Sequence, residues 1–133
     1  MIEVTFESKL RQSAELAVKV GLNIQAGQHL GLTGRGSGIA LTSFMRQVVD
    51  IAYQTGASYV DALVLDGHMD LVRLQHATQE SLEFYPAWPK ERLLAILEQG
   101  GAIMSIFAGD LNLLAGQDPE RINLSGRSAA LVI

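Results

Sequence analysis

The chain has no cysteine, only three prolines among its 133 residues and 6% aromatic side chains. Without cysteine the protein can form no disulfide, no thiolate metal site and no cysteine nucleophile, a usage typical of a cytoplasmic protein. Its lysines and arginines form no basic cluster and its net charge is −4. We therefore expect neither nucleic acid nor an anionic membrane as a partner. No apolar run is long enough to span a bilayer.

Hydrophobic residues make up 48% of the chain and charged residues 18%, which favours a single domain over residues 1–133 with a sizeable core. A 3.6-residue apolar period predicts a helix over 39–55. Apolar stretches predict strands over 29–34, 59–66 and 102–107. Helices alternating with strands imply βαβ crossovers. We predict an α/β fold with a mostly parallel sheet flanked by helices, in a Rossmann-like arrangement of three layers.

The most conspicuous motif is "GLTGRGSGIALTSF" (31–44), which places four glycines before the predicted helix. A Walker A loop requires lysine where Ser37 stands, and the dinucleotide pattern requires glycine where Ile39 stands. The residues favour a mobile turn between strand and helix. As the alternative, Arg35, Gly36, Ser37 and Gly38 form an anion-binding candidate at a helix N-terminus.

The other candidate residues have equally plain structural roles. "DGHMD" spaces Asp66, His68 and Asp70 as metal ligands on an extended segment, but a strand passing into a helix favours Asp66 as the cap and His68 on the surface. Ser37 lacks the G-x-S-x-G context of a nucleophile elbow. Trp88 is expected in the core or at an interface. The residues alone predict no catalytic and no metal-binding side chain.

Four stretches, in order along the chain, resemble the opening of the two-domain metallo-aminopeptidases of the aminopeptidase T and aminopeptidase S type. The most specific is "AELAVKVGLNIQAGQHL" (14–30). "AYQTGASYV" (52–60), "LVRLQHATQESLEFYPAW" (71–88) and "GDLNLLAGQDPERI" (109–122) are similar to the segments that follow. The glycine-rich stretch departs from the family, whose members usually pass from strand to helix more directly.

The resemblance implies the non-catalytic N-terminal domain of a cytoplasmic enzyme that releases N-terminal residues from peptides. It implies two divalent metal ions, of the zinc or cobalt type, in a separate C-terminal domain, and a homodimer of the intact enzyme. No metal ion is expected in this chain. The apolar ending at Ile133 suggests that the chain is part of a longer protein. The alternatives are a free-standing α/β module that binds a ligand or anion through Gly34–Gly38, and a related metal-dependent enzyme of different chemistry.

Overall fold

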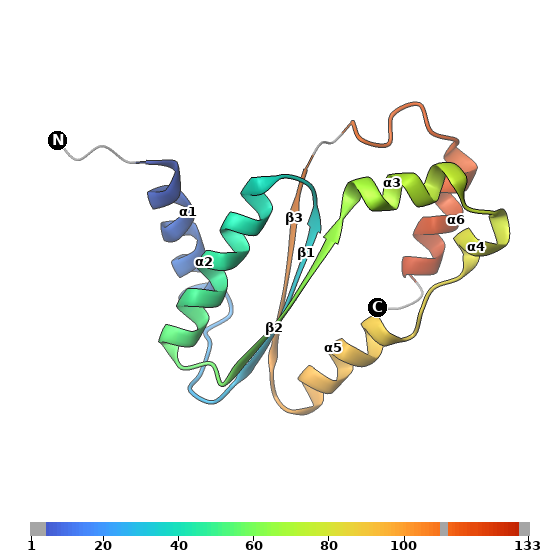
Figure 1. The fold of residues 1–133 in the computed structure, drawn as a ribbon. Helices are drawn as coiled ribbons and strands as arrows, with labels where there is room; N and C mark the ends of the chain where they lie inside the picture. Colours follow the sequence, from blue (N-terminus) through green and yellow to red (C-terminus); the bar gives the residue numbers. More distant parts are fainter. Residues whose placement is uncertain (1–4, 110–111, 131–133) are drawn as a thin grey trace.

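The computed structural model, which describes residues 5–109 and 112–130, contains a sheet of three parallel strands. The strands are β1 (His29–Gly36), β2 (Tyr59–Asp66) and β3 (Ala102–Ala108), in the order β2-β1-β3 (Figure 1). The register pairs Gly36 at the end of β1 with Asp66 and with Ala108. All three strands therefore end at the same edge of the sheet.

Helices cover both faces of this sheet. Helix α2 (Ile39–Thr55) lies on one face, together with α1 (Phe6–Glu15) and its π-helical continuation η1 (Leu16–Gly21), and α5 (Trp88–Glu98) lies on the other (Figure 1). The connections from β1 to β2 and from β2 to β3 run in opposite directions across the sheet, so right-handed crossovers place their helices on opposite faces. The predicted α/β fold is confirmed.

The main hydrophobic core lies between the sheet and the helices α1, η1 and α2. Alternate residues of β1 point into it, and Leu30 and Leu32 are fully buried. From α2, the apolar stripe that the sequence predicted is buried at Leu41, Met45 and Val48. Burying one such side chain contributes about 1.5–3 kcal/mol. This cluster holds the central strand in place.

The opposite face of the sheet is anchored by an arginine from α5. Arg92 is 12% exposed and pairs with Asp61, with 2.9 Å between Nε and Oδ1. It also donates to the Thr33 hydroxyl at 2.8 Å and to the backbone oxygens of Leu32 and Asp61. A guanidinium so extensively hydrogen-bonded is stably buried, because each of its three nitrogens has at least one acceptor. It fixes α5 across β1 and β2.

The strand predicted over 29–34 continues through Arg35 and Gly36, so the predicted mobile turn is wrong at these two residues. Gly34, Arg35 and Gly36 pair with both neighbouring strands. A Cβ at Gly34 would lie 2.2 Å from the Met45 sulfur, so this glycine lets α2 approach the sheet. Gly36 has φ +143°, and a Cβ there would lie 1.3 Å from the Ala108 backbone oxygen. The connection to α2 is confined to Ser37 and Gly38.

The remaining helices form a group beyond the ends of the strands: α3 (Gly67–His76), α4 (Gln79–Glu83) and α6 (Pro119–Ala130) (Figure 1). The sequence predicted a short helix over 110–116, but residues 112–116 form turns, while the apolar end at 131–133 lies outside the described residues. Trp88 is not in the core, since it is 49% exposed. No described helix has the length and apolar character needed to cross a membrane.

Candidate functional site

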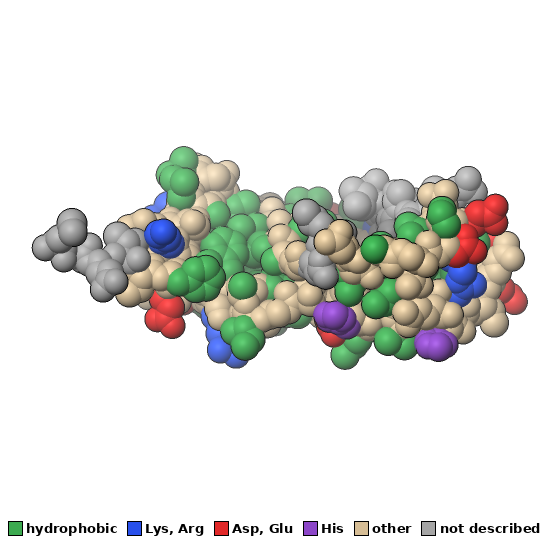
Figure 2. Space-filling model, turned by 90° about the horizontal axis from the view of Figure 1, so that it is seen from above, with side chains coloured by type: hydrophobic (Ala, Val, Ile, Leu, Met, Phe, Trp, Pro, Cys, Tyr) green, Lys and Arg blue, Asp and Glu red, His purple; other side chains and the backbone are tan. Residues whose placement is uncertain are grey.

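A cavity of about 1060 Å³ opens where the three strands end. The ends of β1, β2 and β3 form one side, α3 and α6 form another, and the connection from α4 to α5 closes a third. Figure 2 looks onto this end of the molecule, where hydrophobic side chains gather toward α1 and α2 and are more scattered on the side of α3 and α6. The volume of the cavity suits a small organic ligand, since pockets for such ligands measure about 300–1000 Å³.

The position of the cavity follows from the topology. The chain leaves β1 toward β2 on one side of the sheet, whereas β3 lies on the other side of β1. The direction of the connections therefore reverses between β1 and β3. In open α/β sheets, ligands bind in the crevice at such a switch point, outside the carboxyl ends of the strands. Ser37 and Gly109, which follow β1 and β3, both line the cavity. The fold thus defines this chain as an α/β domain with a pocket in the usual binding position.

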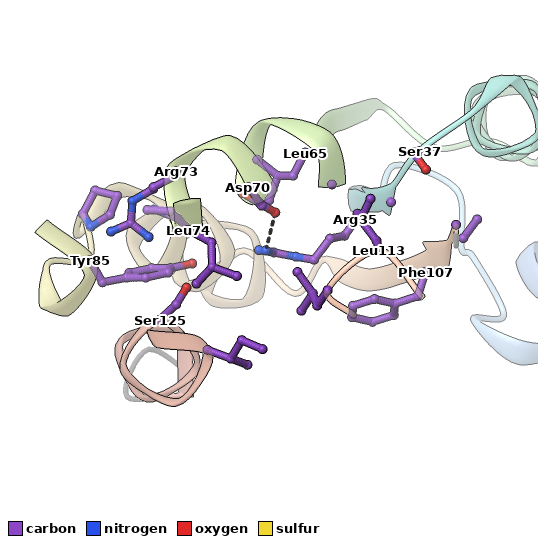
Figure 3. Close-up of a pocket in the computed structure, with 18 of the residues that line it drawn as sticks. Arg35, Ser37, Leu65, Asp70, Arg73, Leu74, Tyr85, Phe107, Leu113 and Ser125 are labelled. Atoms are coloured by element: carbon purple, nitrogen blue, oxygen red, sulfur yellow. Dashed lines mark hydrogen bonds and ion pairs between the residues drawn. The ribbon is translucent and has the colours of Figure 1, made fainter. Parts of the chain in front are cut away.

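The structure divides the residues of the predicted anion site. The Arg35 side chain enters the cavity and pairs with Asp70 of α3, at 3.4 Å between Nη1 and Oδ2 (Figure 3). The Ser37 amide is engaged, because it donates to the Ala108 oxygen at 2.9 Å. Gly38 begins α2 without a side-chain cap and is exposed. Arg35 extends on the face of the sheet that α5 covers, whereas α2 packs on the other, so the guanidinium and the helix N-terminus do not converge. Anion binding by the four residues together stays a prediction.

The far wall of the cavity contributes other polar groups. Figure 3 shows Tyr85 and Ser125 extending inward from the side opposite Arg35. Arg73 of α3 donates through Nη2 to the backbone oxygens of Ser81, at 2.5 Å, and Phe84, at 3.1 Å. Those bonds fix the start of the connection to α5, which carries Tyr85. The wall is therefore held by hydrogen bonds as well as by apolar contacts.

A second arginine holds α6 in this wall. Arg121 donates from Nε to the Leu74 oxygen at 2.9 Å and from Nη2 to the Ala77 oxygen. Both acceptors lie where α3 ends, where helical carbonyls lack a partner within the helix. Because Arg121 supplies that partner, α6 is fixed against α3 and the Ser125 side chain is placed at the cavity.

The candidate metal ligands of "DGHMD" do not converge. Asp66 caps α3, its Oδ1 accepting from the His68 amide at 3.2 Å, as the sequence predicted. His68 is exposed, again as predicted, and Asp70 is the partner of Arg35. Within residues 5–109 and 112–130, no group of three or more histidine, aspartate and glutamate side chains is placed to hold a metal ion. Among the described residues, the side chains of this trio are therefore not arranged as the ligands of a metal centre.

Sequence reasoning found Arg35 and the strand ends but missed Tyr85, Arg73 and Ser125 as cavity residues. The parallel strands signal that residues following 36, 66 and 108 meet at one edge. Nothing local signals that the connection at Tyr85 and the helix at Ser125 return to that edge, because their positions depend on how α3, α4 and α6 pack.

Comparison with known proteins identifies the domain further. The family model described as thermophilic metalloprotease (M29) matches residues 6–132. Aminopeptidase 2 of Geobacillus stearothermophilus is 35% identical over 125 residues, and aminopeptidase T of Thermus thermophilus is 31% identical over 125; each alignment covers 94% of this chain and 30% of the relative. The solved structure of wild-type AmpT from Thermus thermophilus superposes with a TM-score of 0.85 at 30% identity, covering 96% of this chain and 32% of that one.

This chain belongs to the M29 family of metalloproteases. It spans about 30% of the length of the curated relatives that it matches. The resemblance to the aminopeptidase T and S type is confirmed, and the match fits an N-terminal domain of these enzymes.

Proposed function

We propose that this chain is the N-terminal, non-catalytic domain of a metal-dependent aminopeptidase that acts on peptides. The observation that carries the proposal is the match over residues 6–132 to a metalloprotease family whose named members are about three times longer. The similar solved structure extends the agreement to the whole described fold.

The arrangement of acidic and histidine side chains supports a non-catalytic role. Metal-assisted hydrolysis needs ligands that hold a metal with an open position for water. The candidate trio is separated into a helix cap, an exposed imidazole and an ion pair. In an intact enzyme, two divalent ions of the zinc or cobalt type would be held by residues outside this chain. The domain would form part of the wall around that site.

The test compares the isolated chain with the same chain placed in an intact aminopeptidase. The first sample is the purified chain, and the second is Thermus thermophilus aminopeptidase T with its matching segment replaced by this chain. Both are assayed with leucine anilide in added zinc or cobalt, and their bound metal is measured. We expect the isolated chain to be inactive and metal-free, and the chimera to bind metal and release anilide.

Two controls make the outcome interpretable. Aminopeptidase T lacking the matching segment shows what the domain contributes, and thermal unfolding shows that each protein is folded. Metal-dependent hydrolysis by the isolated chain would contradict the non-catalytic role. A folded chimera that binds metal but releases no anilide would contradict the proposed equivalence of the two domains. The homodimer implied by the resemblance stays a prediction, which sedimentation of the chimera would examine.

A further inference from the structure

We propose that the cavity at the strand ends binds a small organic carboxylate with an aromatic or branched apolar body, and that Arg35 pairs with its carboxylate. This inference goes beyond the peptidase role and does not rest on it, because it concerns side chains that this chain itself provides. Three observations support it: the unengaged N–H donors of Arg35, the hydroxyls on the opposite side of the cavity and the apolar lining between them.

Arg35 is available to a ligand. Its side chain is 40% exposed. Among the residues that the structure describes, its ion-pair partner is Asp70, at 3.4 Å between Nη1 and Oδ2, and the Asp70 side chain is itself 53% exposed. An arginine and a carboxylate in a strong pair make two parallel hydrogen bonds at about 2.7–2.9 Å. This pair is longer and is not bidentate. The planar edge of the guanidinium therefore remains open to a carboxylate in the cavity.

The hydroxyls of Tyr85 and Ser125 face the cavity from the side opposite Arg35 (Figure 3). Neither hydroxyl makes a hydrogen bond to another described residue. Polar groups that enter an apolar cavity unpaired gain most from a ligand that supplies acceptors. The two hydroxyls can donate to an acceptor oxygen at the far end of a ligand whose carboxylate lies at Arg35.

The rest of the lining selects an apolar body. Trp88 is 49% exposed, Phe84 66% and Phe107 77%, although all three line the cavity. Leu74 and Leu113 add aliphatic surface beside them. Aromatic side chains left open to water contribute most when a ligand covers them. A ligand with a ring or a branched chain would cover this surface while its carboxylate reaches Arg35.

The charges around the cavity favour an anion over a cation. Among the described residues that line it, two are arginines, Arg35 and Arg73, and one is a carboxylate, Asp70. Arg73 directs Nη2 to neutral backbone oxygens. Asp70 competes with the ligand for Arg35, so removing its charge should strengthen binding.

The probe is N-acetyl-L-phenylalanine, titrated into the 133-residue chain while amide shifts are followed by NMR. We expect saturable shifts at millimolar concentration for the amides around Arg35, Tyr85 and Ser125. Arg35→Gln should weaken binding at least about tenfold, because the charge-assisted hydrogen bonds to the carboxylate are lost. Asp70→Asn should tighten binding a few-fold.

Matched controls separate charge, shape and folding. Arg46→Gln removes the same charge from an exposed residue of α2 outside this cavity, and it should leave the affinity unchanged. L-Phenylalaninamide presents the same ring with a cation and no carboxylate, and it should bind at least tenfold more weakly. The amide spectrum of each variant shows that it is folded.

Several results would overturn the inference. These are the absence of saturable shifts at millimolar probe, equal affinity in Arg35→Gln and Arg46→Gln, or equal affinity for the amide and the acid. Each can occur whether or not the chimera releases anilide, so failure here is distinguishable from failure of the proposed peptidase role.

Discussion

Replacing Gly36 by alanine tests whether the glycine-rich stretch is built for close packing at the strand ends. The new Cβ would lie 1.3 Å from the Ala108 oxygen and 2.5 Å from its carbonyl carbon. Those atoms are backbone, and the Ala108 oxygen also accepts from the Ser37 amide. β3 must therefore move away from β1 at the edge of the cavity.

The magnitude follows from two costs. Holding an alanine at φ +143° costs about 1–2 kcal/mol. Losing the Ser37–Ala108 bond and the adjoining contacts costs about 1–2 kcal/mol more. We expect Gly36→Ala to lower the free energy of unfolding by about 2–4 kcal/mol. A chain of this length has about 7–20 kcal/mol of stability, so the variant should still fold.

Gly38→Ala is the matched control. Gly38 also has a positive φ, +97°, but a Cβ there meets nothing within 4 Å. Gly38→Ala should therefore lower the free energy of unfolding only through backbone strain, by about 1–2 kcal/mol. Urea unfolding followed by far-ultraviolet circular dichroism measures both variants. If Gly36→Ala is no more destabilising than Gly38→Ala, the close approach of β1 and β3 is not what requires glycine at position 36.

Other side-chain networks give three further predictions. Arg92→Gln should lower the free energy of unfolding by about 2 kcal/mol in urea unfolding, because Asp61 and backbone oxygens lose their donor; Arg92→Lys should recover little of it, since an ammonium cannot reproduce the fork. Arg121→Gln should speed amide hydrogen exchange at the end of α3 and in α6, and unchanged exchange would show that this arginine does not hold the wall. The hydrogen bond from Arg11 lowers the pKa of Asp50 in the folded protein. The Arg11–Asp50 pair therefore stabilises the fold at pH values above the unfolded pKa of about 3.8. This stabilisation is lost as the pH falls through the lower pKa of the folded state. In Arg11→Gln the pKa of Asp50, measured by NMR, should rise.

The sequence by itself determined the fold class of this protein and most of its helices and strands. Period and capping did so locally: the stripe from Leu41 to Val48 admits only a helix with one buried face, and Asp66 and Thr78 each accept a hydrogen bond at the start of the helix that follows. Alternation of strands with helices then required parallel strands and crossovers. The resemblance of four ordered stretches identified the family, because ordered matches specify a shared fold.

Only the tertiary structure decided what the glycines do and where the cavity lies. In the sequence, Gly34 and Gly36 cannot be told from flexible turn residues, because the atoms that require them belong to Met45 of the next helix and to Ala108 of β3, and only the packing of those elements brings them close. The residues that lie around Arg35 in the cavity are likewise not recognisable from the sequence. Asp70 looks like a metal ligand in the sequence, and Tyr85 has no local signal at all. Their roles arise from the packing of α3 and the connection to α5 beyond the sheet, which no local pattern specifies.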